Sequence, residues 1–117
     1  MIVAAAVTVC FVLWPTSSVS QPLSARAAFA ACLSDKNVKI FGSDSCENCV
    51  LQKGMFEDDF NKIHYINCDI NQDECTQNDI QKWPTWMYNG ASLVGVQTFR
   101  DLAGFSGCAW SENGRIL

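Results

Sequence analysis

Two cysteines separated by two residues, Cys46 and Cys49, are the side chains of this sequence with the clearest potential for chemistry. Exchange of disulfides requires a thiolate that attacks and a second thiol that resolves the mixed disulfide. If a helix begins at Cys46, its unpaired N–H groups and its dipole stabilise a negatively charged sulfur there. Cys49 then lies one turn later on the same face. The spacing therefore predicts Cys46 as the attacking thiol and Cys49 as the resolving thiol.

The sequence around these cysteines predicts a strand before them and a helix after them. Residues 38–42 are rich in β-branched and aromatic side chains, and residues 46–60 repeat apolar side chains at helical spacing. A C-x-x-C motif by itself is only moderately specific for redox chemistry. Its position between a strand and a helix is the context that such a site needs, and this makes the motif a stronger signal.

The remaining elements complete an α/β pattern. We expect a strand at 63–67, a polar acidic loop at 68–75, a short helix around 76–82, strands at 85–88 and 93–96, and a last helix that begins at Thr98 and is ended by Gly107. The Asn89-Gly90 pair between the last two strands is a strong hairpin signal. A helical crossover joins parallel strands and a tight hairpin joins antiparallel ones. The order therefore predicts a central mixed sheet of about four strands flanked by helices.

The first part of the chain differs in composition from the rest. Residues 2–14 form an uncharged apolar run, which is short for a membrane-spanning helix of about 20 residues. We expect residues 1–30 to be a signal peptide or membrane anchor with its linker, and residues 31–117 to be the folded domain. Small-x-small cleavage sequences lie within residues 25–30. A helix over residues 22–34 is the competing interpretation of the same alanines.

The chain has seven cysteines among 117 residues, which is a high count. Such a count fits an oxidising compartment, where disulfides persist, or a metal site. Cys68 and Cys75 bracket the acidic loop. We favour a structural disulfide that closes this loop, and the alternative is a relay pair that passes electrons to or from the C-x-x-C cysteines. Cys32 and Cys108 could each be free or could pair with each other.

A metal site is the main alternative from a different class. The C-x-x-C pair and the pair around the acidic loop could supply four thiolates to zinc, but zinc ribbons use two tight C-x-x-C pairs and the second pair here is wider. Asp69, Asn71 and Asp73 match the first ligand positions of a calcium-binding loop. Glu74 replaces the required glycine and Ile80 replaces the bidentate glutamate, so this match fails. We therefore predict no metal site.

Several segments, in order along the chain, resemble one known group of proteins. They are Phe41-Gly42-Ser43-Asp44-Ser45-Cys46-Glu47-Asn48-Cys49, Gln52-Lys53 with Phe56, Tyr65-Ile66-Asn67-Cys68, Glu74-Cys75-Thr76, Pro84-Thr85-Trp86, Asn89-Gly90, Gly95-Val96 and Leu102-Ala103. Together they resemble the thioredoxin-like domain that is fused to bacterial and plant homologues of vitamin K epoxide reductase. The resemblance covers roughly residues 36–107 and implies a thioredoxin-like fold.

The resemblance also implies a function, partners and a compartment. In the fusion proteins the membrane part makes disulfides with quinone, and the thioredoxin-like domain passes them to exported proteins. We therefore expect a protein thiol–disulfide oxidoreductase that a membrane vitamin K epoxide reductase-like partner reoxidises, either in trans or as part of a longer fusion. The implied location is the periplasm, the thylakoid lumen or the secretory lumen, with residues 2–14 as the anchor if they are retained. No cofactor is expected.

The Trp83-Pro84-Thr85 segment lies directly before a predicted strand, and Pro84 follows Cys46 by 38 positions. In thioredoxin-like proteins a cis-proline loop faces the C-x-x-C motif and offers backbone groups to the substrate chain. The resemblance therefore implies a cis Trp83–Pro84 bond and a substrate-binding role for Trp83, Pro84 and Thr85. The alternative is an ordinary trans proline that opens an edge strand.

The sequence leaves the direction of the reaction open. It departs from thioredoxin because no tryptophan precedes Cys46 and no proline stands at position 48, while Glu47 places a negative charge beside the nucleophile. A disulfide reductase or isomerase is therefore the alternative activity. The alternative class is a zinc-binding or disulfide-stapled interaction domain. The net charge of −4 and the lack of a basic cluster disfavour a nucleic acid as partner.

Overall fold

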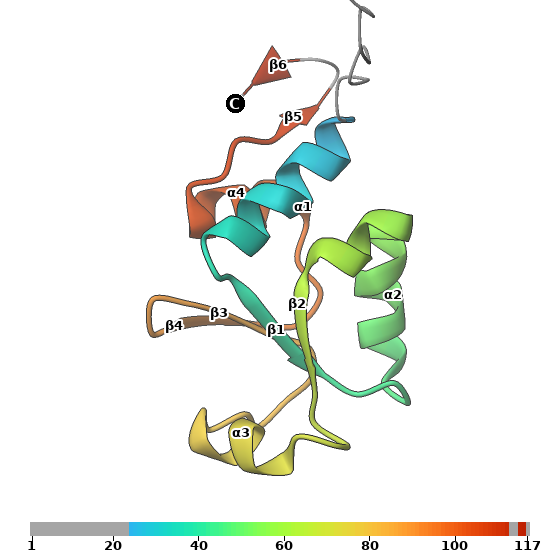
Figure 1. Cartoon of the computed structure of the whole chain (residues 1–117), viewed down its shortest axis with the longest axis vertical. Helices are drawn as coiled ribbons and strands as arrows, with labels where there is room; N and C mark the ends of the chain where they lie inside the picture. The colour runs from blue at the N-terminus through green and yellow to red at the C-terminus, as the bar shows by residue number, and fades with distance from the viewer. Residues whose placement is uncertain (1–23, 113–114, 117) are drawn as a thin grey trace, which may run out of the picture.

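The computed structural model describes residues 24–112 and 115–116 of the chain (Figure 1). Its elements follow in the order α1 (Ala25–Asp35), β1 (Lys39–Gly42), α2 (Glu47–Phe56), the 3-10 helix η1 (Glu57–Lys62), β2 (His64–Asn67), α3 (Gln72–Gln77), β3 (Thr85–Tyr88), β4 (Ala91–Val94), α4 (Phe99–Ser106), β5 (Ser111–Glu112) and β6 (Arg115–Ile116). The predicted α/β fold is confirmed for the part of the chain that is described, in which four α-helices accompany a four-stranded sheet.

The central sheet has the strand order β2-β1-β3-β4. β1 pairs in parallel with β2, across the crossover that contains α2, and pairs antiparallel with β3. β3 and β4 form an antiparallel hairpin. The mixed sheet is therefore confirmed, and its pairing directions follow from the connections. Because β1 and β2 are parallel, their carboxyl ends meet at one end of the sheet, where α3 lies (bottom of Figure 1).

The larger hydrophobic core lies between one face of the sheet and helices α1, α2 and α4. Ile40 of β1 and Trp86 of β3 are register partners and are buried together. Phe29, Phe56 and Leu102 join them, one from each of the three helices. Each such fully buried side chain contributes about 1.5–3 kcal/mol of hydrophobic stabilisation. This core holds α2, and therefore the C-x-x-C motif, against the sheet.

A smaller core lies on the opposite face, because successive side chains of a strand point to opposite faces. Phe41 of β1 and Ile66 of β2 are register partners and are buried with Cys68 and Cys75. A disulfide joins these two cysteines, with sulfur atoms 2.03 Å apart. The bond holds α3 against this face of the sheet, so the predicted pairing of Cys68 with Cys75 is confirmed.

The helix interpretation of residues 22–34 is the one observed. α1 begins after Ser24, whose hydroxyl accepts the N–H of Ala27, and it buries Phe29, Ala30 and Leu33. α1 therefore covers the alanines of the predicted cleavage sequences, because small side chains that suit a cleavage site also suit close helix packing. The signal or anchor predicted at residues 2–14 lies outside the described residues. No helix within residues 24–112 and 115–116 is long and apolar enough to cross a bilayer.

A second disulfide ties α1 to the segment after α4. Cys32 and Cys108 are joined across 76 residues of sequence, with Cα atoms 5.9 Å apart. Lys36 adds a hydrogen bond from Nζ to the carbonyl of Ser106 at 2.9 Å. The sequence left these cysteines either free or paired, and the structure shows the pair. The two ends of the described domain are therefore held together covalently.

Two predicted helices differ from those observed. The helix expected over residues 46–60 ends as α2 at Phe56, where Glu57 has a positive φ of 49°, and η1 continues the chain as a 3-10 helix. The helix expected around residues 76–82 is wrong in position, because α3 begins inside the predicted acidic loop and ends at Gln77. Only Cys75 of α3 is buried, so the sequence there has no apolar periodicity that would reveal a helix.

The hairpin prediction is confirmed, although its second strand is shifted. Asn89 and Gly90 have φ values of 49° and 78°, the positive values that a type I′ turn requires. Such a two-residue turn pairs Tyr88 directly with Ala91, so β4 begins at Ala91 and not at residue 93. The last helix begins after Thr98, which forms a capping box, and ends at the left-handed Gly107, as predicted.

Candidate redox site

Cys46 is the N-cap of α2. Its sulfur accepts the backbone N–H of Cys49 at 3.2 Å, so cysteine takes the place of the usual serine or aspartate cap. The N–H of Cys46 donates to the carbonyl of Ser43 at 3.2 Å and closes the turn between β1 and α2. The positive end of the helix dipole favours negative charge on a sulfur in this position. The Cys46 side chain is half-buried, so part of its surface is open to another sulfur.

Cys49 lies in the first turn of α2 and is buried, with 1% of its surface exposed. Its sulfur lies against Gly42, the last residue of β1, where an added Cβ would come within 2.8 Å of Sγ. The missing side chain of Gly42 therefore makes room for this thiol. Burial raises the pKa of Cys49 to about 11, and its hydrogen bond with Cys46 adds to the rise. Cys49 is consequently a neutral thiol at pH 7.

The Trp83–Pro84 peptide bond is cis, as predicted. β1 and β3 are antiparallel and place Phe41 opposite Thr85. Pro84 directly precedes Thr85, and Gly42 directly follows Phe41. The cis proline and the glycine against which Cys49 lies are therefore each next to one residue of this Phe41–Thr85 pair, although they are far apart in the sequence.

The three residues predicted to bind substrate have different exposures. Trp83 is 41% exposed, whereas Pro84 and Thr85 are buried. The Thr85 hydroxyl donates to the carbonyl of Lys82 at 2.6 Å, and the Pro84 carbonyl accepts the N–H of Gly95 at 2.7 Å. Of these three residues, only Trp83 offers an open side chain, since Pro84 has no N–H and its carbonyl is already bonded to Gly95.

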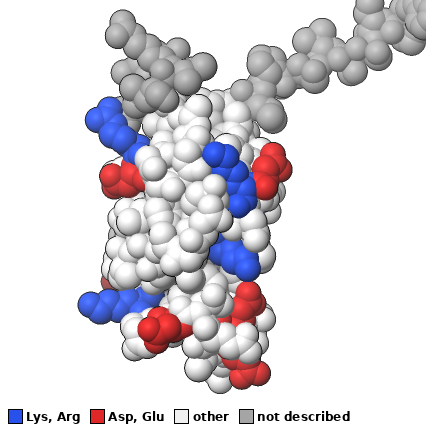
Figure 2. Space-filling view, turned by 90° about the vertical axis from the view of Figure 1, so that its left-hand side faces the viewer, with Lys and Arg blue, Asp and Glu red and all other residues white. Residues whose placement is uncertain are grey.

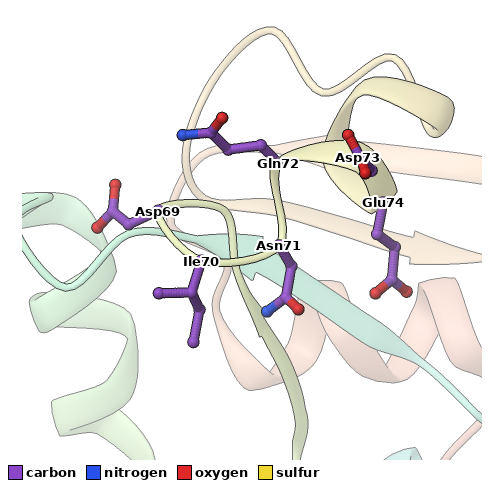
Figure 3. Close-up of a pocket in the computed structure, with 6 residues that line it drawn as sticks. All are labelled: Asp69, Ile70, Asn71, Gln72, Asp73 and Glu74. Atoms are coloured by element: carbon purple, nitrogen blue, oxygen red, sulfur yellow. The ribbon is translucent and has the colours of Figure 1, made fainter.

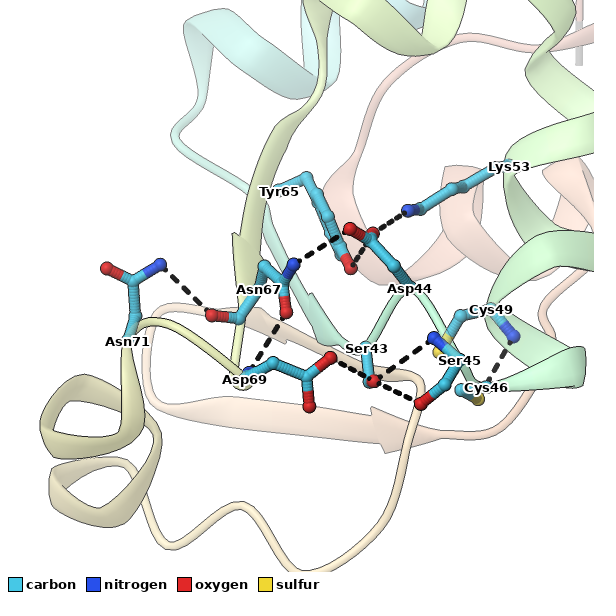
Figure 4. Close-up of polar contacts among 10 residues, drawn as sticks. All are labelled: Ser43, Asp44, Ser45, Cys46, Cys49, Lys53, Tyr65, Asn67, Asp69 and Asn71. Carbon is cyan, nitrogen blue, oxygen red and sulfur yellow. Dashed lines mark hydrogen bonds and ion pairs between the residues drawn. The ribbon is translucent and has the colours of Figure 1, made fainter.

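A set of hydrogen bonds around Asp44 joins the turn before Cys46 to α2 and β2 (Figure 4). The carboxylate accepts Lys53 Nζ at 3.0 Å, the Tyr65 hydroxyl at 3.1 Å and Asn67 Nδ2 at 3.0 Å. These bonds, with the one from Lys53 first, hold the pKa of Asp44 below its usual range. Burial, followed by the bond to Asp44, raises the pKa of Tyr65. Asp44 therefore stays ionised and fixes the turn.

A second set of bonds links this turn to the residues around Cys68 (Figure 4). Ser43 is buried, and its hydroxyl bonds to Asp69 Oδ2 at 2.6 Å and accepts the N–H of Ser45 at 3.3 Å. The N–H of Cys68 donates to the carbonyl of Gly42 at 2.7 Å. The loops that carry the two cysteine pairs are therefore directly bonded to each other at the ends of β1 and β2.

The Cys68–Cys75 disulfide borders a hollow of about 270 Å³. Trp83, the residue before the cis proline, and Ile80 line the same hollow. The two cysteines are largely covered, with 5% and 6% of their surfaces exposed. The structure places this disulfide beside the cis-proline segment, and whether its role is structural or that of a relay stays a prediction.

The acidic residues after β2 do not converge on a common point. Acidic side chains gather at the end of the molecule where α3 lies (Figure 2). In the close-up of this loop, Asp69, Asp73 and Glu74 point away from one another (Figure 3). Within the described residues, no three His, Cys, Asp or Glu side chains are grouped to hold a metal ion. The zinc alternative also lacks two thiolates, since Cys68 and Cys75 are joined to each other.

Sequence reasoning assigned no role to Gln52, which proves to be a fully buried polar residue of α2. One signal for it was present. Gln52 follows Cys49 by three residues and precedes Phe56 by four, so helical spacing places all three on one face. Since Cys49 and Phe56 are both expected inside, a glutamine between them must find buried hydrogen-bond partners.

No model of a known protein family matches this chain. The class of protein is therefore defined by the fold and the site. It is an α/β domain with a C-x-x-C dithiol at a helix N-terminus and a cis proline at the neighbouring strand.

Proposed function

We propose that this protein is a thioredoxin-like thiol–disulfide oxidoreductase that exchanges disulfides with other proteins through Cys46 and Cys49. One observation carries the proposal: a half-buried Cys46 caps α2, Cys49 in the next turn is buried against Gly42 of β1, and cis Pro84 leads into β3, the strand that pairs with β1. The strand order and the sequence resemblance support the thioredoxin-like assignment.

The proposed reaction is two successive exchanges, written here for oxidation of a client. A client thiolate attacks Sγ of Cys46 in the Cys46–Cys49 disulfide, and Cys49 leaves with the electron pair of the broken bond and takes up a proton. A second client thiolate then attacks the client sulfur of the mixed disulfide, and Cys46 leaves as a thiolate. Two electrons have moved from the client to the two cysteines, and the client holds the new disulfide. The reverse sequence reduces a client disulfide.

The two cysteines suit different steps of this reaction. Cys46 has open surface and the helix N-terminus to stabilise its thiolate, so it is the sulfur that meets the client. Cys49 is buried, and its raised pKa of about 11 keeps it protonated, so it does not compete for clients. In the reductive direction Cys49 must first lose its proton, which makes resolution of the mixed disulfide dependent on pH.

The direction that we propose is donation of disulfides to exported proteins, with reoxidation by a membrane vitamin K epoxide reductase-like partner in trans. The Cys32–Cys108 and Cys68–Cys75 disulfides support an oxidising compartment, because cytosolic thiols keep such pairs reduced. The apolar run at residues 2–14 supports export or anchoring. Reoxidation passes the two electrons from Cys46 and Cys49 to a disulfide of the partner and then to quinone.

A thiol-trapping titration tests the proposal. Wild-type protein, Cys46→Ala and Cys49→Ala are equilibrated in glutathione buffers, quenched with acid and alkylated, and the oxidised fraction is measured by mass. We expect one two-electron couple in the wild type that neither variant retains. A potential near about −120 mV supports donation of disulfides, and one near about −270 mV supports the reductase alternative.

The same samples test the alternative class. Stoichiometric zinc bound to the reduced protein would contradict the proposal in favour of a zinc-binding domain. A reversible couple that survives in either single variant would show that the titrating pair is not Cys46 with Cys49. The double variant Cys68→Ala/Cys75→Ala is the matched control, because it removes two cysteines and leaves the proposed site intact.

A further inference from the structure

Gln52 is a fully buried residue of α2 whose side chain bonds to two other parts of the fold. Its Oε1 atom accepts the indole N–H of Trp86 at 3.0 Å and the backbone N–H of Gln97 at 2.7 Å. Its Nε2 atom donates to the carbonyl of Gln97 at 3.1 Å and to Met55 Sδ at 3.4 Å. One amide thus joins the C-x-x-C helix to β3 and to the segment that follows β4.

These partners lead directly to the cis proline. Trp86 lies in β3, two residues after Pro84. On the other side, the Gln97 side chain donates to the carbonyl of Gly95 at 3.3 Å, and the N–H of Gly95 donates to the carbonyl of Pro84 at 2.7 Å. From Gln52, two routes of bonded residues therefore end at Pro84. At the other end of this connection, Gln52 lies one turn after Cys49 on α2.

We propose that Gln52 is a positioning residue that sets the cis-proline segment relative to the C-x-x-C cysteines, so that a client chain lying along this segment presents its sulfur to Cys46. This inference rests on the proposed function. A peptide client needs both the sulfur of Cys46 and the segment that holds its backbone. A small disulfide needs only Cys46, so Gln52 matters for the peptide and not for the small reagent.

The hydrogen-bond pattern explains why the residue is glutamine. The site requires an acceptor for the N–H groups of Trp86 and Gln97 and a donor for the carbonyl of Gln97. Leucine supplies neither and removes the partner of the buried Trp86 indole N–H and of the two partly buried backbone groups of Gln97. An ionised glutamate accepts but cannot donate, whereas a protonated glutamic acid does both. Gln52→Leu and Gln52→Glu therefore test the same contacts in two different ways.

The experiment measures two second-order rate constants for the reduced full-length protein. One is for a peptide disulfide with at least five residues on each side of the cysteine, and the other is for Ellman's reagent. For Gln52→Leu we expect the peptide rate constant to fall about tenfold, the factor for about 1.4 kcal/mol, while the rate constant for Ellman's reagent changes less than about twofold. Gln77→Leu, a change of exposed glutamine in α3, is the matched control and should alter neither rate constant.

The Gln52→Glu variant adds a readout that a general loss of stability would not move. Its peptide rate constant, divided by the wild-type value at the same pH, should rise as pH falls and the carboxyl gains its proton. The inference is overturned if both rate constants fall together in Gln52→Leu, if neither changes in the folded variant, or if the Gln52→Glu ratio is flat with pH. A wild-type protein that reacts with Ellman's reagent but with no peptide disulfide would instead refute the proposed function.

Discussion

The two cysteine pairs that follow β1 and β2 lie at the same end of the sheet, yet their surroundings differ. Cys46 caps a helix and is half-buried, and Cys49 beneath it is a free thiol. Cys68 and Cys75 are joined to each other within an apolar cluster, and neither of them caps a helix. The comparison teaches that a helix start next to an accessible sulfur distinguishes the candidate redox pair from its neighbour, since both pairs lie at the same end of the sheet.

The two pairs are also connected, which makes the comparison sensitive to mutation. The Ser43–Asp69 bond and the bond from Cys68 N–H to the Gly42 carbonyl join their loops. A substitution in one loop can therefore alter the cysteine pair carried by the other loop. The predictions below either separate the two pairs or show that they act together.

The largest effect is expected for loss of the attacking sulfur. Cys46→Ser should lower the rate of exchange with a peptide disulfide by about a thousandfold or more, because hydroxyl is a far weaker nucleophile than thiolate. The rate is measured by release of the peptide thiol. Cys68→Ser/Cys75→Ser serves as the comparison and should stay within about threefold of the wild type. A comparable loss in that double variant would mean that the two pairs are not distinct.

The second prediction concerns the pH dependence of resolution by Cys49. A thiolate fraction rises about tenfold per pH unit below its pKa, and the pKa of Cys49 is raised to about 11 by burial. Resolution of a preformed mixed disulfide on Cys46 should therefore accelerate about a hundredfold between pH 7 and pH 9, as followed by quenched-flow mass analysis. A resolution rate that is already level above pH 7 would contradict the buried, protonated state of Cys49.

The third prediction compares how much each of the two disulfides contributes to the free energy of unfolding. The loop closed by Cys32–Cys108 spans 76 residues and the loop closed by Cys68–Cys75 spans 7. Loop-closure entropy predicts that removal of the first lowers the free energy of unfolding by about 4.5 kcal/mol and removal of the second by about 2.5 kcal/mol. Chemical denaturation of the two double alanine variants measures both values. Equal losses would show that loop length does not govern these bonds.

The Cys68→Ala/Cys75→Ala variant also distinguishes the two roles left open for that pair. As a structural disulfide, its loss should leave turnover with the proposed membrane partner unchanged once the variant is held below its unfolding temperature. As a relay, its loss should stop turnover with that partner while exchange with Ellman's reagent continues. Quinone reduction measured with partner and client together decides between these outcomes.

The smallest effect is expected at the glycine that adjoins Cys49. Gly42→Ala places a Cβ 2.8 Å from Sγ of Cys49, so the thiol or the strand must move, at a cost of about 1–3 kcal/mol in unfolding free energy. Gly54→Ala is the matched control, because Gly54 is in α2 with open space around it, and alanine there should stabilise by about 0.5–1 kcal/mol. A neutral Gly42→Ala would show that Cys49 has more room than the structure indicates.

The parts of the fold that the sequence predicted well are those with short-range signals. The hairpin at Asn89-Gly90 and the helix after Thr98 each depend on a few adjacent residues. The placement of α3 could not be predicted in this way, since it is a mostly exposed helix with one buried residue, Cys75. The N-terminal alanines suited two interpretations, and only packing against the core selected the helix.

In the candidate site too, some residues were predicted from short-range signals and others were not. Cys46 and Cys49 were found from spacing and flanking pattern, and the resemblance pointed to the cis Trp83–Pro84 bond. Gln52 was missed, because its partners lie 34 and 45 residues further along the chain. The residues adjacent to Gln52 in the sequence therefore do not reveal its hydrogen-bond partners.

By itself the sequence determined the order of strands and helices around the C-x-x-C motif and the type of the hairpin turn. These depend on backbone preferences and capping groups that act within a few residues. Only the tertiary structure decided that Cys32 pairs with Cys108, that Cys49 is buried against Gly42, and that one glutamine bridges α2 to the strand that follows the cis proline. The physical reason is that each of these contacts joins segments whose distance in space is set by packing of the whole core.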